Sequence, residues 1–101
     1  NRALEIFTES VERYPNDAES LYNLGFIHLE LALLKPAREY FTRCLQVNAL
    51  NYRAYYGRGF TWERGGDLSN AAADYRKALE YNPIHEASQI ALRRVMDKVE
   101  Q

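Results

Sequence analysis

Apolar residues recur along this chain three or four positions apart, in short stripes that are separated by polar turns. In one stripe Leu21, Leu24 and His28 fall on a single helical face. In a later stripe Ala37 and Phe41 do the same. The stripes predict helices near residues 2–14, 18–31, 36–48, 52–65, 69–82 and 86–100. The sequence contains no alternating strand pattern, so we expect an all-α protein.

The helical pattern repeats after 34 residues. Gly25 recurs as Gly59 and Phe41 recurs as Tyr75, each 34 positions later. A fixed period of this length means that each repeat is one supersecondary unit, which buries its apolar face by stacking on its neighbours. A glycine that recurs inside a helix indicates a close approach of two helices, because it has no Cβ. Stacked repeats present an extended surface, so the period favours binding over catalysis.

Turn and cap residues separate the predicted helices. Residues 65–67 read Gly-Gly-Asp, which is a turn signal, whereas the corresponding turn at residues 32–35 reads Ala-Leu-Leu-Lys. Pro36 fits the first turn of the helix that follows, where a missing N–H costs little. Asp17 and Asn51 are natural N-caps for the helices after them.

These features together resemble the tetratricopeptide repeat (TPR), a helix-turn-helix family. The matching positions within residues 52–85 are Tyr55, Arg58, Gly59 and Trp62 in the first helix (helix A), Gly66, Asp67 and Leu68 in the turn, Ala71, Tyr75 and Ala78 in the second helix (helix B), and Asn82 and Pro83 at the end. Arg58 departs from the family, in which leucine is commonest at this position. Residues 18–51 depart further, with Cys44 in place of alanine and Ala49 in place of the closing proline.

The resemblance implies a single TPR domain over residues 1–101, folded as a right-handed α-solenoid of about six antiparallel helices. Residues 1–17 would be helix B of a partial repeat, residues 18–51 and 52–85 two repeats, and residues 86–101 a C-terminal capping helix. Terminal repeats are atypical because they cap the stack. In the capping helix we expect inward-facing apolar residues, namely Ile90, Leu92, Val95, Met96 and Val99. Its charged residues should be mostly solvated, namely Arg93, Arg94, Lys98 and Glu100.

Composition narrows the class of partner. Thirteen Lys and Arg residues against fourteen Asp and Glu residues give a formal net charge of −1. Repeat proteins that bind RNA have a similar period, but domains that bind nucleic acid are usually strongly basic. The near-neutral charge therefore argues against nucleic acid as the partner. No apolar run approaches the length that a bilayer requires, so we expect no membrane insertion. One cysteine excludes an internal disulfide and favours a reducing compartment, so a cytoplasmic location is expected.

The sequence offers no catalytic, metal or cofactor constellation. A metal site needs several convergent ligands, whereas the chain has two histidines. His28 is expected to pack between helices and His85 to be solvated in a loop. Cys44 stands where the family has alanine, so a small buried thiol is expected rather than a nucleophile. Glu30 and Glu63 are interpreted as solvated groove charges rather than an acid–base pair.

The face of helix A opposite the core stripe carries aromatic residues that packing alone does not require. In TPR proteins this face lines a concave groove that receives a peptide, and rigid aromatic side chains are typical anchors. We therefore expect a protein or peptide ligand there. The predicted groove residues are Glu19, Tyr22, Asn23, Phe26, Arg53, Tyr56, Gly57, Phe60, Arg64, Ile90 and Arg94, with Leu29, Glu30 and Glu63 beside them. Asn23 and Arg53 match part of the carboxylate clamp of chaperone-binding TPR domains, but Gly57 replaces its arginine, so the clamp is incomplete.

Two other readings remain open. The chain could be a structural module that forms homo-oligomers through the groove or through the helix at residues 2–14. A homodimer would cover Leu4 and Phe7, each of which forfeits about 1.5–3 kcal/mol if left in water. The chain could also be the adaptor portion of a larger enzyme.

Overall fold

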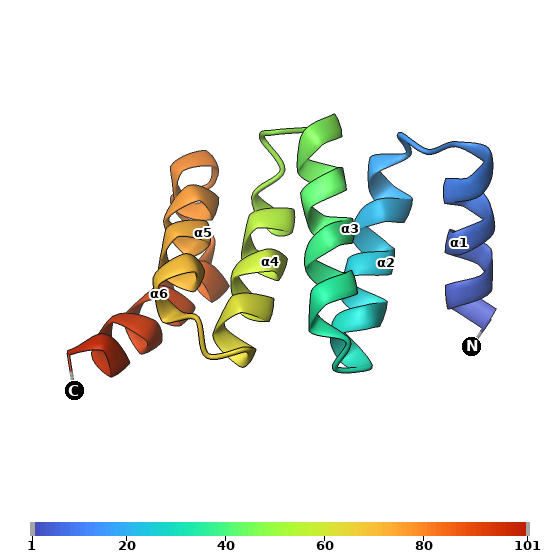
Figure 1. Cartoon of the computed structure of the whole chain (residues 1–101). Helices are drawn as coiled ribbons and strands as arrows, with labels where there is room; N and C mark the ends of the chain where they lie inside the picture. The colour runs from blue at the N-terminus through green and yellow to red at the C-terminus, as the bar shows by residue number, and fades with distance from the viewer. Residues whose placement is uncertain (1, 101) are drawn as a thin grey trace.

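Six helices follow one another in the computed structural model, which describes residues 2–100. Their bounds are α1 Arg2–Arg13, α2 Ala18–Glu30, α3 Leu34–Val47, α4 Tyr52–Arg64, α5 Leu68–Tyr81 and α6 Glu86–Val99. Neighbouring helices alternate in direction and stand in chain order, from blue α1 at one end to red α6 at the other (Figure 1). The described residues form no strand and measure 45 × 25 × 18 Å along their principal axes. The prediction of an all-α solenoid of about six helices is confirmed.

The N-caps predicted from the sequence account for the starts of α2 and α4. The Asp17 side chain accepts a hydrogen bond from the backbone N–H of Ser20 at 3.4 Å and caps α2. Asn51 caps α4 in the same way. Helix α3 begins at Leu34, two residues before its predicted start at residue 36, so Pro36 lies in its first turn. Proline is tolerated there because the first backbone N–H groups of a helix have no partner within the helix.

The two helix A–helix B turns differ in backbone strain. Gly66 adopts φ +88°, which glycine tolerates, whereas Ala32 at the corresponding position is held at φ +60°. Asp67 also caps α5 by accepting from the N–H of Asn70 at 3.0 Å, whereas the corresponding Leu33 makes no side-chain cap. The first turn is therefore locally less favourable than the second.

We expect Ala32→Gly to raise the free energy of unfolding by about 0.5–1 kcal/mol. Relief of the left-handed backbone is worth about 1–2 kcal/mol, and the larger entropy that glycine loses on folding offsets part of it. Urea denaturation followed by circular dichroism measures the change. The control is Ala73→Gly in the interior of α5, which should instead cost about 1 kcal/mol. A destabilised Ala32→Gly protein would contradict the inferred strain.

Two aromatic rings hold the helix pairs together. A Cβ at Gly25 would lie 2.6 Å from Phe41 Cε1, and one at Gly59 would lie 2.8 Å from Tyr75 Cε1. Real Cβ atoms essentially never approach another atom so closely, so each glycine leaves room for the ring of its helix B. Phe41 and Tyr75 are fully buried, in two separate core clusters. The predicted close approach at the recurring glycine is confirmed.

The buried stripe of α6 was predicted only in part. Val95 is fully buried, and Leu92 and Met96 pack against the second core cluster, as expected. Ile90 and Val99 are exposed, so their predicted inward orientation was wrong. The buried residues of α6 are Ser88, Ala91 and Val95, which lie three and four positions apart, and of these only Val95 was predicted. Small residues on this stripe let α6 lie against α5.

Candidate functional site

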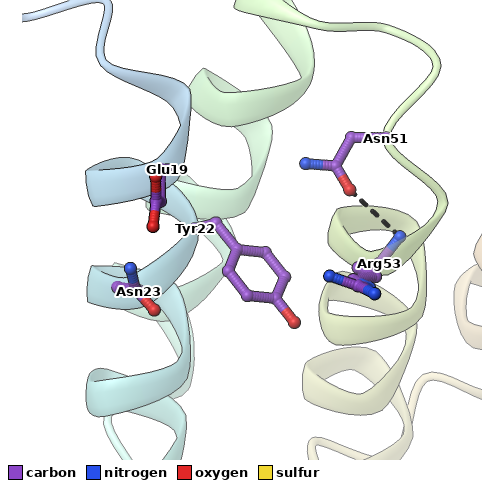
Figure 2. A pocket seen from close by; sticks show the side chains of 5 residues that line it. All are labelled: Glu19, Tyr22, Asn23, Asn51 and Arg53. Atoms are coloured by element: carbon purple, nitrogen blue, oxygen red, sulfur yellow. Dashed lines mark hydrogen bonds between the residues drawn. The ribbon is translucent and has the colours of Figure 1, made fainter.

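A hollow lies between α2 and the beginning of α4. Its volume is about 430 Å³, and its lining residues are Glu19, Tyr22, Asn23, Asn51 and Arg53. Figure 2 shows the Tyr22 ring projecting from α2 towards the first turn of α4, where Arg53 faces it. Four of the eleven predicted groove residues thus surround one hollow.

The position of Arg53 follows from the cap of α4. The side-chain oxygen of Asn51 accepts from the backbone N–H of Arg53 at 3.1 Å and from that of Ala54 at 3.2 Å (Figure 2). The amide nitrogen of Asn51 donates to Cys44 Sγ at 3.5 Å, which ties the cap to α3. The Asn51 side chain therefore joins the first turn of α4 to α3, and this turn holds Arg53 opposite Tyr22.

The hollow combines a half-buried neutral tyrosine, Tyr22, with an exposed cation, Arg53. Burial raises the pKa of the Tyr22 phenol above its ordinary value of 10.0, and the nearby Arg53 guanidinium offsets part of this shift. Tyr22 therefore stays neutral and keeps a hydroxyl that can donate. Arg53 is exposed, and no carboxylate of residues 2–100 lies within 4.0 Å of its guanidinium. The Arg53 guanidinium lies 5.6 Å from the centre of the Tyr52 ring, so a ligand would meet a cation without a carboxylate partner between aromatic rings.

The aromatic residues of the predicted groove are only half exposed. The Tyr22 ring lies 4.9 Å from that of Phe26, and Phe26 in turn contacts the buried Phe41 ring edge-on at 5.1 Å. In the second repeat the rings of Tyr56 and Phe60 lie 6.3 Å apart. These side chains therefore serve the cores with one edge and face solvent with the other.

Three predicted groove positions are not where the helical face placed them. Gly57 is buried, and a Cβ there would lie 2.5 Å from Phe41 Cζ, so this position packs against α3 rather than lining a groove. Leu29 is buried in the first core cluster. Ile90 lies at a different hollow, which it shares with Ile84, Glu86, Gln89 and Arg93. Helical spacing fixes the side of its own helix on which a residue lies, but not which neighbouring helix covers that side.

Glu63 is a buried ion-pair partner, which corrects its interpretation as a solvated charge. Its side chain is only 9% exposed and accepts from Arg94 Nε at 2.6 Å and from Arg94 Nη2 at 2.7 Å. The Tyr75 hydroxyl donates to Glu63 Oε1 at 2.8 Å, and Lys98 Nζ lies 3.7 Å from Oε2. The hydrogen bonds from Arg94 are the main reason that the pKa of Glu63 falls below its ordinary value of 4.5. Arg94, predicted to be mostly solvated, joins α6 to α4.

The two histidines and the cysteine take part in packing and hydrogen bonding. His28 packs as predicted, and its Nδ1–H donates to the Leu24 carbonyl at 2.8 Å. His85 is not the solvated residue that was expected, since it stands edge-on to the Tyr52 and Tyr56 rings and its burial lowers its pKa. Cys44 is buried, which raises the pKa of its thiol and confirms the expected packed cysteine.

Neither a metal site nor a membrane span stands out in the described part of the chain. No group of three or more His, Cys, Asp or Glu side chains among residues 2–100 is arranged to hold a metal ion. None of the helices over the same residues is both long enough and apolar enough to span a membrane.

Comparison with known proteins gives the family. Two family models, both described as tetratricopeptide repeat, match residues 6–35 and 52–85. The chain belongs to the TPR family. Among curated proteins it is 30% identical over 76 residues to BBSome complex member BBS4 of Bos taurus, a match that covers 75% of this chain. The chain spans only 15% of the length of that relative.

Solved TPR structures share the fold closely. The Arabidopsis OM64 TPR domain is 28% identical, with a TM-score of 0.94 over 97% of this chain and 81% of that domain. The first TPR of Spaghetti (RPAP3), solved bound to the HSP90 peptide SRMEEVD, is 19% identical, also with a TM-score of 0.94, over 97% of this chain and 78% of that one. At that identity the second likeness shows the fold alone.

Two residues with a part in the structure were not predicted from the sequence, namely Asn51 at the hollow and Asp74 as the partner of Arg58. Asn51 was predicted as the N-cap of α4 but not as a residue that lines the hollow. The available signal was its position two residues before Arg53, which was predicted to line the groove. The partner of Arg58 was missed as well. Asp74 lies 16 positions away, and nothing in the sequence singled it out as buried.

Proposed function

We propose that this TPR domain is a protein-interaction scaffold that binds a peptide segment of a partner protein in the hollow between α2 and α4. The observation that carries the proposal is the half-buried Tyr22 ring beside Arg53, a cation with no carboxylate partner among the described residues. Tyrosine and arginine are among the residue types that are enriched where most of the binding energy of a protein interface is concentrated. Support also comes from a structure of the same fold that was solved with a peptide bound.

The chemistry of the hollow suits a peptide. Its volume of about 430 Å³ falls within the usual range of ligand pockets. Tyr22 offers an apolar face and a hydroxyl, Asn23 can pair with a peptide backbone group, and Arg53 can bind a carboxylate. The lining contains no nucleophile with an adjacent base, so we assign binding rather than catalysis. The single buried thiol, Cys44, fits a reducing compartment such as the cytoplasm.

The test is a selection from a library of short random peptides with the intact chain. The best selected peptides should bind Tyr22→Ala and Arg53→Ala at least about tenfold more weakly than the original protein, or about 1.4 kcal/mol, because these side chains supply the anchor and the free cation. Fluorescence anisotropy with the labelled peptides measures the affinities.

Two matched controls accompany that measurement. Tyr14→Ala and Arg13→Ala remove the same side-chain types from exposed positions at the end of α1 and beyond it, and should leave the affinity unchanged. Circular dichroism checks that every variant keeps its helices. Peptides that bind Tyr22→Ala and Arg53→Ala as tightly as the original chain would refute the hollow as the binding site.

Self-association is the second candidate. Ile6 is exposed on α1, where Phe7 is half-buried against the first core cluster. A second copy of the chain could cover this apolar surface. Light scattering at several concentrations separates the two candidates. A mass that rises with concentration and returns to that of a monomer in Ile6→Lys would favour self-association.

A further inference from the structure

Another hollow, here called the Trp62 hollow, lies on the outer face of α3. Its volume is about 540 Å³, and its lining residues are Lys35, Arg38, Glu39, Thr42 and Arg43 of α3 and Trp62 of α4. None of them lines the hollow at Tyr22. On α4, Arg53 and Trp62 are nine residues apart, which is about two and a half helical turns, so they lie on opposite sides of that helix. The Trp62 hollow is therefore separate from the Tyr22 hollow.

The Trp62 hollow contains an aromatic ring with a cation over it. Trp62 is half-buried, and Arg38 Cζ lies 4.3 Å from the centre of its ring. This distance is well within the range of about 6 Å over which a ring attracts a cation. The contact restrains the Arg38 side chain, so Arg38 loses less entropy on binding a carboxylate than a free surface arginine does.

A hydroxyl group in the Trp62 hollow is also held in position. Arg58 Nη1 donates to Thr42 Oγ1 at 3.2 Å, and the same guanidinium is fixed by its two hydrogen bonds to Asp74 of α5. The Thr42 oxygen therefore acts as an acceptor here, and its O–H remains a donor for a ligand.

Cations outnumber carboxylates in the Trp62 hollow. The lining contains the three cations Lys35, Arg38 and Arg43 and one carboxylate, Glu39. No carboxylate of residues 2–100 lies within 4.0 Å of any of these three cations. Lys35 and Arg43 are exposed, so a ligand can reach them from solvent. A ligand would thus meet positive charge around an aromatic ring.

The stacking of the repeats does not require this arrangement. The position of Arg38 is taken in α1 by Leu4 and in α5 by the buried Ala72, which stand 34 residues before and after it. The first repeat has His28 at the position of Trp62. Apolar residues therefore suffice at the equivalent positions of the neighbouring helices, and the cation on α3 favours a role in binding.

We propose that the Trp62 hollow is a docking site for an acidic segment of a partner protein. One apolar side chain of that segment lies against Trp62, and carboxylates beside it pair with the three cations of the hollow. Charge complementarity assigns this occupant, because arginine pairs with carboxylates and no described carboxylate satisfies these cations. The inference does not rest on the proposed function, since no residue lines both hollows. A chain that binds at both hollows would hold two partner segments on opposite sides of α4.

Trp62 is the only tryptophan of the chain, so its fluorescence reports on this hollow. The test is a selection from a library of short random peptides with the Arg53→Glu chain, in which the exposed cation of the Tyr22 hollow is reversed. The selected peptides should be enriched in Asp and Glu on either side of an apolar residue. Their binding should change the Trp62 emission, because the apolar side chain lies against the indole ring.

Two double variants of the same chain decide whether the cations bind the peptides. Lys35→Gln/Arg43→Gln should bind them at least about tenfold more weakly, and added salt should reduce the difference, because both cations are exposed. The control Arg13→Gln/Arg76→Gln removes the same charge from exposed positions of α1 and α5 and should leave the affinity unchanged. Titrations followed by Trp62 fluorescence measure the affinities, and circular dichroism checks that each variant keeps its helices.

Four results would overturn the inference. They are a selection that yields no acidic peptides, peptides that leave the Trp62 emission unchanged, equal binding by Lys35→Gln/Arg43→Gln, and equal loss of binding by the control. A single-stranded RNA that changes the Trp62 emission and binds more tightly than the peptides would replace the acidic segment by nucleic acid. An emission that changes with the concentration of the chain alone would replace it by a second copy. The proposed function is unaffected by each of these results, since its test is the dependence of binding on Tyr22.

Discussion

Phe41→Ala is expected to lower the free energy of unfolding by about 3–5 kcal/mol, the cost of removing a fully buried phenylalanine and leaving a cavity. The Phe41 ring fills the slot between α2 and α4, where Gly25 and Gly57 both make room for it. It also supports the Phe26 ring at 5.1 Å and the Tyr22 ring at 6.2 Å. The substitution should therefore weaken the first repeat and loosen the Tyr22 ring, which lines the hollow. Urea denaturation followed by circular dichroism measures the loss.

The cause can be separated from a general loss of apolar surface. Phe41→Leu should cost less than Phe41→Ala, because it leaves a smaller cavity. Gly57→Ala should cost about 1–3 kcal/mol in the original chain, since its Cβ would lie 2.5 Å from Phe41 Cζ. In the Phe41→Leu background Gly57→Ala should cost clearly less, because the ring that it strikes is gone. Equal costs in both backgrounds would show that Gly57 is not there to accommodate the ring.

Asp74→Ala is expected to cost about 2–4 kcal/mol of stability, because it leaves the Arg58 charge partly buried without its partner. The pair is bidentate, with Arg58 Nε 2.8 Å from Asp74 Oδ2 and Arg58 Nη2 2.9 Å from Oδ1. The Asp74 side chain is 8% exposed and that of Arg58 is 23% exposed, so solvent screens the pair only in part. A third bond, from Arg58 Nη1 to Thr42 Oγ1 at 3.2 Å, ties α3 to α4. Chemical denaturation again measures the change.

The control for Asp74→Ala replaces Arg58 by the residue that the first repeat has at the same position. That residue is Leu24, which is fully buried and apolar. Arg58→Leu alone should destabilise the protein, because it leaves the Asp74 carboxylate buried and unpaired. The double variant Arg58→Leu/Asp74→Ala should recover most of the loss, because removing both partners leaves no unsatisfied charge. A double variant as unstable as the sum of the two single variants would show that the ion pair is not coupled.

The helices, their order and their partners in the core could be predicted because the signals are local. The stripes that include Leu24 and Phe41 follow from the period of the α-helix, and the caps Asp17 and Asn51 act within three residues of themselves. The repeat of 34 residues then places Gly25 against Phe41 and Gly59 against Tyr75, because equivalent residues make equivalent contacts. Each of these inferences requires only one repeat and its nearest neighbour.

The residues that line the hollow could be predicted only in part. Tyr22, Asn23 and Arg53 meet at the hollow because helical spacing puts them on the outer side of α2 and α4. Gly57 shares that side by spacing, yet it is buried, because α3 packs against α4 at an angle that brings Phe41 onto it. The burial of Glu63 depends on a contact with Arg94, 31 residues away, and on how α6 turns against α4.

The sequence by itself determined the class of fold, the repeat, the aromatic and glycine contacts within each repeat, and a helix face rich in aromatic residues. Each of these is encoded by spacings shorter than one repeat. Only the tertiary structure decided which residues of that face reach solvent, where the hollow opens, and that Arg58 and Arg94 have buried carboxylate partners. The angles between successive helices set these features, and those angles arise from the packing of side chains that lie far apart in the sequence.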